Sequence, residues 1–563
     1  MVSETAAAGA SSPRSIHRIS GMLLAGMLAI AAATESGTVE GADAGAESLR
    51  ARVAELRTER AVRVDGAEIA ARRLIAAFYE RRGFRPVWAR PGQAEALAVA
   101  IEESRSHGLD PRDYHAAAVR RLASGATPGL GEADREVLLT DALVRLAYHL
   151  HFGKANPREL YPGWNFPRSL GAIDPVAALE EIVTSPALGE ALERYAPRLP
   201  AYRGLREALA RYRTIEAGGG WPRIGPGPTL EPGMRDPRVA ALRARLIASG
   251  DIERGASEPA QFDEGLETAV RRFQSRHGLE ADGIVGRRTV AALDVGVARR
   301  IDQVRVNLER VRWVAQDLVG DYLIVDIAGF SARLVLDGRL VWSSRVVVGR
   351  PYRRTPVFRA TLEHVVLNPT WTVPPTILRE DLLPKLARDP DYLARHRMQV
   401  VDASGRPVKV SEIVWDRPGG FPYQIVEAPG DDNPLGQLKF VLPNPHAVYL
   451  HDTPAGQLFE KTQRAFSSGC IRLEKAFELA VLLLDDPQRW SADALRTAIA
   501  SGQTRSVRVN HRVPVVLLYF TAEVDEDGTV RFHPDFYDRD PRVLAALGAP
   551  FRFSPVDARR GSR

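Results

Sequence analysis

The chain has 563 residues, 45% of them hydrophobic and 26% charged, which is an ordinary globular composition and enough for about three or four domains. Its net charge of +6 is spread without a dense Lys/Arg tract interleaved with aromatic residues, so nucleic acid is not an expected partner. The single cysteine excludes an internal disulfide and a cysteine-rich zinc site.

The N-terminus has the pattern of an export signal. Arg14 and Arg18 precede a short apolar run, residues 21–33, which ends in small residues. This is typical of a secretory signal cleaved near Ala33. The run is shorter than the roughly 20 residues of a membrane span, and an uncleaved inner-membrane anchor is the alternative. We therefore expect a signal peptide over residues 1–34 and an exported protein.

The following region is dominated by helical patterns. Residues 35–65 are rich in Ala, Gly and Glu and are expected to form a disordered or weakly helical lead. From residue 66 to 217 apolar residues recur at helical spacing, which predicts one helical domain. Residues 218–231 are rich in Gly and Pro and are expected to be a linker. Residues 232–294 carry further helical patterns and predict a second, smaller helical domain.

From residue 321 to about 500 the apolar period changes to that of strands. Residues 322–327 predict a strand, and the runs on either side of Asp337-Gly338 predict a β-hairpin. A Pro- and charge-rich insertion, residues 375–436, interrupts the strands. Residues 505–550 contain another hairpin pattern and are expected to form a C-terminal β extension. The predicted fold class is therefore multidomain α+β.

The only cysteine, Cys470, is a candidate nucleophile, because a thiol attacks carbonyl groups once a lowered pKa makes it a thiolate. The run Leu473–Leu484 predicts a helix, whose N-terminus would lower the pKa of this thiol. Backbone N–H groups of the turn that contains Ser468 and Gly469 would point at a developing oxyanion. The alternative is a small buried apolar residue. An unpaired cysteine in an exported chain favours the nucleophile.

His451 is the candidate base for this thiol. It ends a predicted strand nineteen positions before Cys470, and a Cys–His pair is the minimum set for cysteine acyl transfer. A surface or hydrogen-bonded histidine is the alternative. Asp452 follows, but neighbouring residues on a strand point to opposite faces, so its side chain is not expected to orient the His451 ring.

These motifs resemble one enzyme family. His-Asp-Thr-Pro from His451, followed by Ser-Ser-Gly-Cys-Ile-Arg ending at Arg472, is similar to the signature of the L,D-transpeptidase (YkuD-domain) family. Residues 346–350 and 368–374 resemble further blocks of that family. Many members have a second His where this chain has Ser468, so no role of that His is carried over.

The Ser-Ser-Gly-Cys form is similar to that of the large periplasmic branch from Gram-negative bacteria. That branch has an N-terminal scaffold domain, a peptidoglycan-binding domain and a lid-like insertion in the catalytic domain. Residues 66–217 resemble the scaffold, residues 232–294 the three-helix peptidoglycan-binding domain, and residues 375–436 the insertion. The resemblance thus covers nearly the full chain and implies a periplasmic location.

The resemblance implies a cross-linking reaction on peptidoglycan. Cys470 would attack the carbonyl of the third stem residue and expel the terminal D-Ala, with His451 accepting and returning a proton. Backbone N–H groups at Gly469 and Cys470 would hold the oxyanion. The amine of a second stem would resolve the thioester and give a 3→3 cross-link. No metal or cofactor is required. The expected partners are donor and acceptor stem peptides, with cell-wall synthesis proteins as further candidates.

Four other site residues have open roles. Arg472 either holds a substrate carboxylate or braces the cysteine loop through an ion pair. Trp371 and Tyr449 either line the substrate groove or pack in the core. Ser468 is expected to hydrogen-bond within the loop and is given no catalytic step.

Two other functions compete with the transpeptidase. An L,D-carboxypeptidase would use water in place of the amine, and a non-catalytic scaffold would only bind the wall. The pair of Cys470 and His451 argues against the scaffold. The acceptor stays open, because its choice depends on groove shape and water exclusion. Residues 375–436 are expected to form a solvated, partly mobile flap that covers the groove and favours the amine.

Overall fold

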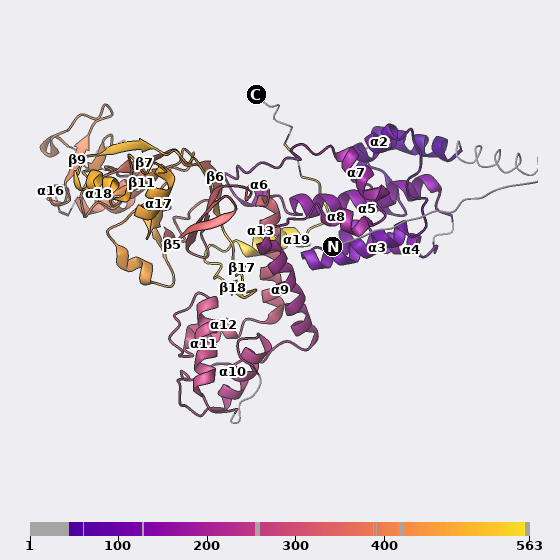
Figure 1. The fold of residues 1–563 in the computed structure, drawn as a ribbon, viewed down its shortest axis with the longest axis horizontal. Coiled ribbons are helices and arrows are strands. Elements are labelled where there is room, and N and C mark those ends of the chain that lie inside the picture. The colour runs from indigo at the N-terminus through magenta and orange to yellow at the C-terminus, as the bar shows by residue number, and fades with distance from the viewer. Residues whose placement is uncertain are drawn as a thin grey trace, which may run out of the picture.

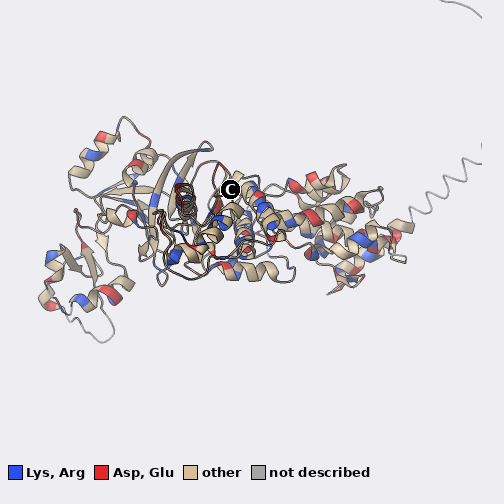
Figure 2. Cartoon of the chain, turned by 90° about the horizontal axis from the view of Figure 1, so that it is seen from below, with Lys and Arg blue, Asp and Glu red and all other residues tan. Residues whose placement is uncertain are grey.

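The chain is arranged as a helical region at one end, a strand-rich domain at the other, and a small three-helix unit that projects between them (Figure 1). The computed structural model describes residues 44–557 except 60, 127–128, 254–258, 387, 390, 414, 416–420 and 555. The expected signal peptide, residues 1–34, lies outside the described residues. None of the described helices has the length and apolarity needed to cross a membrane. Acidic and basic residues are interspersed over all parts of the chain (Figure 2).

The N-terminal region is built around α5 (Glu132–Phe152), which is buried on most sides, as expected for a helix at the centre of a bundle. Buried carboxylates on α5 hold the loops around it. Glu136 accepts a hydrogen bond from the Trp88 N–H at 2.9 Å, and Asp141 accepts one from the Ala71 N–H at 2.7 Å. The surrounding elements are β1 (Arg63–Val64), β2 (Ala67–Glu68), α2 (Arg72–Arg81), α3 (Gln93–Glu103), α4 (Ala116–Ala123), α6 (Pro157–Leu160), α7 (Pro175–Thr184) and α8 (Leu188–Glu193).

Residues 44–58 form a helix, which corrects the expectation of disorder within the lead over residues 35–65 in favour of the helical alternative; residues 35–43 and 60 lie outside the described residues. Leu49, Val53 and Leu56 are buried in the core of the N-terminal region and follow each other at helical spacing. An Ala- and Glu-rich composition is shared by disordered segments and by good helix formers. The apolar stripe formed by Leu49, Val53 and Leu56 is the sequence signal that distinguishes a helix from a disordered segment here.

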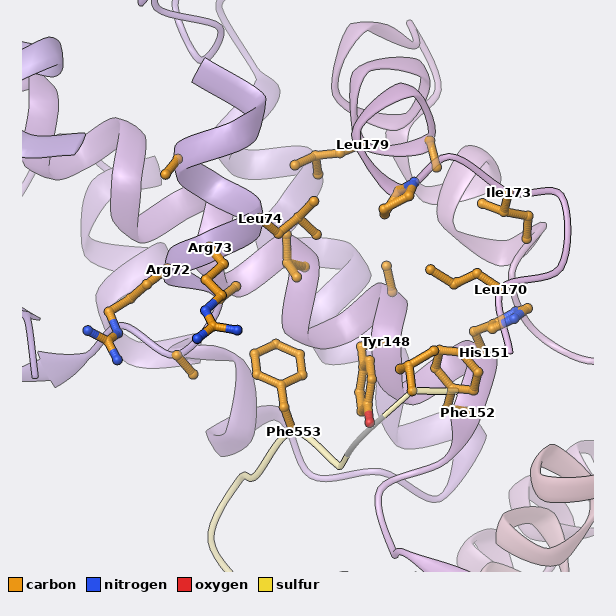
Figure 3. Close-up of a pocket in the computed structure, with 18 of the residues that line it drawn as sticks. Arg72, Arg73, Leu74, Tyr148, His151, Phe152, Leu170, Ile173, Leu179 and Phe553 are labelled. Carbon is orange, nitrogen blue, oxygen red and sulfur yellow. The ribbon is translucent and has the colours of Figure 1, made fainter. Parts of the chain in front are cut away.

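A cavity with a volume of about 1110 Å³ lies in this helical region. Its walls are mainly apolar (Figure 3), with Leu74 from α2 and Leu179 from α7 on one side. Tyr148 of α5 and Phe553 of the C-terminal tail meet edge to face at 4.8 Å. The cavity therefore belongs to the packing of the C-terminal tail against the helices.

The small unit in the middle contains α10 (Pro237–Ala248), α11 (Glu264–Arg276) and α12 (Arg287–Leu293). It has its own apolar core, which includes Leu242, Leu266 and Phe273. The Gln274 amide organises the turn after α11 by donating to Asp282 Oδ1 at 2.7 Å and accepting from the Gly283 N–H at 2.9 Å. Three helices thus form in residues 232–294.

Two long helices, α9 (Pro200–Ala217) and α13 (Val297–Val314), pack side by side where the three regions meet (Figure 1). Arg312 of α13 donates to the Tyr202 hydroxyl at 2.8 Å and to Glu309 at 2.6 Å, fully buried. No element had been predicted between residues 295 and 320. Helix α13 therefore supplies a junction of buried charged pairs that the sequence patterns did not indicate.

The strand-rich domain contains one curled sheet in the order β15-β7-β11-β12-β14-β5-β4-β3-β16-β6, and β13 pairs with β5. The hairpin predicted at Asp337-Gly338 is confirmed, and both turn residues have positive φ, +50° and +71°. The strands are β3 (Tyr322–Asp326), β4 (Ser331–Leu336), β5 (Arg339–Gly349), β6 (Phe358–Thr361), β7 (His364–Leu367), β11 (Leu438–Val441), β12 (Leu450–His451), β13 (Ala465–Ser467), β14 (Ile471–Leu473), β15 (Arg505–Arg508) and β16 (Pro514–Leu518). Helices α17 (Ala476–Leu484) and α18 (Ala492–Ala500) complete the domain, and the predicted multidomain α+β class is confirmed.

Residues 505–550 do not form a separate β extension, contrary to expectation. Strand β15 pairs with β7, and β16 lies between β3 and β6, so both belong to the central sheet. Only the hairpin of β17 (Ala522–Val524) and β18 (Val530–Phe532) is separate, and helix α19 (Asp540–Gly548) follows it. The partners of β15 and β16 lie more than a hundred residues away, and local patterns carry no information on such pairing.

The described part of the insertion, residues 375–436, is a small subdomain with a core of its own, which corrects the expectation of a solvated flap without a core. Strands β8 (Trp371–Thr372), β10 (Gln424–Glu427) and β9 (Met398–Val401) form a sheet, and a small core includes Leu382 and Ile425. Its helical segments are α14 (Pro375–Ile377), a π-helical turn (Leu378–Leu382), α15 (Leu383–Leu386) and α16 (Tyr392–Arg395). The charges dominate the composition, but the few apolar residues suffice for a core.

Candidate active site

Cys470 lies in a short loop between β13 and β14. Both strands pair with β5, β13 in the parallel and β14 in the antiparallel direction. Gly469 has φ +120°, a conformation that favours glycine. Ser467 holds the loop, because its hydroxyl accepts from the Gly469 N–H at 3.1 Å and donates to the Cys470 carbonyl at 2.5 Å. Thr355 donates to the Gly469 carbonyl at 2.9 Å from the opposite side. The position of the thiol is therefore fixed by its own loop.

Two expectations about the thiol are wrong. The residues directly after Cys470 form β14, and the helix begins only at Ala476, so no helix N-terminus faces the sulfur. Burial raises the pKa of the Cys470 thiol, while Tyr449, Lys439 and Arg472 act in the opposite direction. The Gly469 N–H, one of the two expected oxyanion donors, instead donates to the Ser467 hydroxyl within the loop.

Polar side chains form a row across three adjacent strands beside the thiol. Lys439 of β11 is the register partner of His451 of β12, and His451 is the partner of Arg472 of β14. Tyr449 and Cys470 lie two residues before His451 and Arg472, directly ahead of β12 and β14, and side chains two apart in extended backbone share a face. The Ile471 N–H donates to the Tyr449 carbonyl at 3.1 Å, which fixes this register.

The sheet holds His451 as a neutral imidazole. The residue is 4% exposed, its Nδ1 donates to the Asp452 carbonyl at 2.6 Å, and the Leu435 backbone is a second hydrogen-bond partner of the imidazole. Burial lowers the pKa of His451 to about 3, with the charges of Arg472 and Lys439 acting in the same direction. The Asp452 carboxylate accepts from the Gln437 N–H at 3.0 Å. It is the backbone of Asp452, not its side chain, that orients the ring.

Tyr449 interacts with both the thiol of Cys470 and the imidazole of His451. Lys439, which the sequence did not indicate as a site residue, packs against the Tyr449 ring. The Tyr449 and His451 rings meet edge to face at 5.6 Å, and Lys439 Nζ lies 4.1 Å from the Tyr449 ring centroid. Among the described residues no direct hydrogen bond joins His451 to Cys470; the thiol donates to the Ala447 carbonyl at 3.9 Å. The one available signal for Lys439 was its place as a lone charge in an apolar strand.

Arg472 faces a cavity of about 510 Å³ between the cysteine loop and the insertion, which Ser468 and Arg350 also line. Within the described part of the chain Arg472 has no carboxylate partner, and its buried Nε has no acceptor. Burial lowers the pKa of this guanidinium. The geometry therefore favours a substrate carboxylate over an ion pair within the loop.

The insertion contacts the site at two places. Arg353 donates to the Ser468 hydroxyl at 3.0 Å and also bonds the insertion residues Glu380 and Asp381. Trp371, in β8 at the base of the insertion, packs on its core and lies beside the Tyr449 phenol. Ser468 is thus bonded to Arg353 and not within its own loop, and Trp371 stands at the mouth of the site.

The C-terminal segment also supports the cysteine loop. The Tyr537 hydroxyl donates to the Gly349 carbonyl at 2.5 Å and accepts from the Thr355 N–H at 3.0 Å. Thr355 in turn holds the Gly469 carbonyl beside the thiol. This chain of bonds joins residues more than sixty positions apart, and no sequence pattern indicated it.

Comparisons with known proteins identify the three regions. A model of the L,D-transpeptidase catalytic domain (YkuD) matches residues 320–509, a peptidoglycan binding domain matches residues 235–293, and a scaffold domain matches residues 73–209. A Haemophilus influenzae protein named "Putative L,D-transpeptidase" is 38% identical over 242 residues, or 43% of this chain and 48% of the relative. The match thus spans about half the length of that relative.

Solved structures with similarity include an L,D-transpeptidase from Mycobacterium smegmatis, 14% identical, covering 35% of this chain and 58% of that one, with a TM-score of 0.16. Another, from Stackebrandtia nassauensis, is 13% identical and covers 53% of this chain and 96% of that one, with a TM-score of 0.20. TM-scores this low do not establish a shared fold. By its family matches, the chain carries a catalytic domain of the YkuD L,D-transpeptidase family, joined to a peptidoglycan-binding domain and a scaffold domain.

Proposed function

We propose that the chain forms 3→3 cross-links in peptidoglycan through a thioester on Cys470. The observation that carries this proposal is that Ser468 and Arg472, each two residues from the only thiol of the chain, line a cavity of about 510 Å³. A nucleophile next to an unpaired cation suits a substrate with a carboxylate close to the reacting carbonyl. The stem peptide has this chemistry, because its diaminopimelate and terminal D-Ala both carry carboxylates.

In the acylation half, the Cys470 sulfur attacks the carbonyl carbon of the third stem residue. The C–N bond to D-Ala breaks, and the amine leaves with the proton that the thiol gave up. The Cys470 N–H is proposed to stabilise the oxyanion. In the second half, the side-chain amine of another stem attacks the thioester, the C–S bond breaks, and the proton returns to sulfur. The numbers of bonds and protons balance over the cycle.

His451 is proposed to move this proton, although a pKa of about 3 makes its imidazole a weak base. A substrate carboxylate bound at Arg472 would offset one of the two positive charges that lower the pKa of His451. It would therefore raise that pKa toward the working range when the reaction needs a base. Among the described residues no direct hydrogen bond joins the two groups, and Tyr449, whose phenol interacts with the thiol and whose ring meets the imidazole edge to face, is the proposed link between them.

The insertion is proposed to act as a lid. Its contacts through Arg353 and Trp371 place an ordered subdomain next to the thiol, where it would exclude water from the thioester. The amine acceptor would then be favoured over hydrolysis. The peptidoglycan-binding domain, residues 232–294, would keep the chain on the wall, and the export signal would place it in the periplasm.

The test is mass spectrometry of muropeptides after incubation of the purified protein with tetrapeptide-rich sacculi. Cross-linked dimers that resist D,D-endopeptidases, together with free D-Ala, are the expected products. Tripeptides alone would indicate an L,D-carboxypeptidase. Unchanged muropeptides with protein bound to the sacculi would indicate a wall-binding scaffold.

A further inference from the structure

A second cluster of ionisable side chains lies where β3 meets the C-terminal hairpin. Asp326 ends β3, Glu523 is in β17, and His533 directly follows β18. Single ligand atoms from these three residues lie within 4.8 Å of one another. None of the strands that supply Cys470 or His451 contributes to this cluster.

One oxygen of Asp326 has no partner. The residue is 1% exposed, and its Oδ1 accepts from the Phe520 N–H at 3.0 Å and the Ala328 N–H at 3.1 Å. Its Oδ2 is buried and has no hydrogen-bond donor among the described residues. A buried carboxylate oxygen without a donor is costly, so an unpartnered oxygen aimed at other ligand atoms points to a bound group.

The other two residues already share one proton. His533 Nε2 lies 3.0 Å from Glu523 Oε1, while Arg333 donates to Glu523 Oε2 at 3.0 Å. Burial would lower the pKa of His533, but the Glu523 and Asp326 carboxylates raise it, against an opposing effect of Arg531. The arrangement leaves Oε1 of Glu523 and Nε2 of His533 facing the same point as Asp326 Oδ2.

Gly329 keeps space open at that point. A Cβ at this residue would lie 2.5 Å from Asp326 Oδ2 and 3.2 Å from His533 Nε2. The φ of Gly329 is not positive, so the backbone does not require glycine there. The absence of a side chain at Gly329 therefore leaves room beside Asp326 Oδ2 and His533 Nε2.

We propose that Asp326, Glu523 and His533 bind a divalent transition-metal ion. Two carboxylate oxygens and one imidazole nitrogen suit Zn²⁺, whose ligand distances of about 2.0–2.2 Å put tetrahedral ligand atoms roughly 3.4 Å apart. The three atoms need only a small inward movement to reach this spacing. The ion replaces the proton that His533 and Glu523 share. This proton is released to solvent, and no redox change occurs.

The ion would fasten the central sheet to the hairpin that leads to Tyr537. The reaction of Cys470 runs no step through it, and the inference does not depend on the proposed function. Metal binding should therefore raise the melting temperature while leaving the identity of the reaction products unchanged.

The experiment uses metal-stripped, tag-free Cys470→Ser protein, because the thiol is itself a zinc ligand. Calorimetric titration with Zn²⁺ should show one saturable site and, from buffers of different ionisation enthalpy, release of a proton. Asp326→Asn and His533→Gln should each weaken binding by at least about tenfold. The matched control is His511→Gln, which removes a half-exposed histidine paired with Asp321 at 2.8 Å and should leave the affinity unchanged.

Gly329→Ala tests the site without removing a ligand, and its methyl group should also weaken Zn²⁺ binding. Circular dichroism of each variant without metal checks that it is folded. The proposal is overturned if the Cys470→Ser protein shows no saturable Zn²⁺ binding, a result that makes the cluster a proton-sharing network only. Equal affinity in His533→Gln and His511→Gln would overturn it as well.

Discussion

Arg353 donates a hydrogen bond to Ser468, two residues before the nucleophile candidate, at a distance of 3.0 Å. The same guanidinium bonds Glu380 at 2.7 Å and Asp381 at 3.1 Å, both of which belong to the insertion. The insertion and the cysteine loop are thus held by one side chain. A movement of the insertion will therefore shift the loop that carries the thiol.

The double variant Glu380→Gln, Asp381→Asn should loosen the insertion. Each lost pair is half-exposed and worth about 0.2–1 kcal/mol, so the closed form should be disfavoured about two- to thirtyfold. Under the lid proposal the ratio of trimmed stems to cross-links rises, as measured by muropeptide mass spectrometry. Asp389→Asn is the control, because it breaks the pair with Arg395 inside the insertion. An unchanged ratio in the folded double variant would exclude a lid.

Cys470→Ala should abolish turnover and acylation by a carbapenem, which reacts with such thiols in the family that this chain resembles. The chain has no disulfide to lose, so melting temperature and sacculus binding should be unchanged. His451→Ala should lower the acylation rate by about 10²–10⁴. Intact-mass spectrometry measures both variants against His511→Ala. A full-rate adduct on Cys470→Ala would show that another residue is the nucleophile.

Arg472→Lys should reduce kcat/KM by about 10- to 150-fold, mainly through KM, because lysine cannot hold a carboxylate with a planar fork. Steady-state kinetics on tetrapeptide substrates measure the change. Arg345→Lys, which alters an arginine paired with Glu474 at 2.8 Å, should have little effect. A fall in melting temperature without a change in KM would instead indicate that Arg472 braces the loop.

Tyr537→Phe should slow carbapenem acylation of Cys470 by about two- to tenfold, the effect of losing hydrogen bonds of about 0.5–1.5 kcal/mol that position the loop. Sacculus binding should be unchanged. Tyr322→Phe, a half-buried tyrosine in β3, is the matched control. If Tyr537→Phe lowers only the melting temperature and leaves the acylation rate intact, the residue has no positioning role.

Acid should destabilise the chain through His277, which stacks on Phe273 at 3.8 Å and on Phe532 of the neighbouring domain at 5.6 Å. Burial, together with Arg276 and Arg300, lowers the pKa of His277 well below its usual value. Its contribution to stability is therefore complete above the unfolded pKa of about 6.5 and is lost as the pH falls below it, by at most about 1.4 kcal/mol per pH unit.

Urea unfolding at pH 7.5, 6 and 5 measures this effect. His277→Gln should show a smaller loss of unfolding free energy between pH 7.5 and 5 than the unsubstituted chain. His396→Gln, which changes an exposed histidine, should retain the full loss. Identical pH dependence in all three proteins would show that His277 does not control the acid response.

The features that could be predicted from the sequence have local signals. Asp337-Gly338 specifies its hairpin through two residues that tolerate positive φ, and the helical period between residues 232 and 294 specifies three helices. Cys470 and Arg472 form a compact motif, and the structure places His451 and Arg472 on neighbouring strands. The sequence motif and the strand register therefore both bring His451 and Arg472 to the same site.

The features that could not be predicted depend on long-range pairing. Leu473 was expected to begin a helix, but residues 471–473 pair with β5 and β12, and a strand of three residues is too short to show a period. The raised pKa of Cys470 follows from burial, which the motif does not report. Lys439 reaches the site only because β11 lies beside β12. Tyr537 supports the cysteine loop from a segment that follows the family match, which ends at residue 509.

The place of β16 in the sheet has a consequence for how the protein matures. The family match ends at residue 509, yet residues 514–518 fill the gap between β3 and β6, and Tyr537 completes the support of the cysteine loop. A fragment cut at residue 509 would expose two unpaired strand edges and would be prone to aggregate. During synthesis, the thiol can reach its final position only after nearly the whole chain has emerged. Under the proposed function, incomplete copies of the protein would therefore not form the thioester on Cys470.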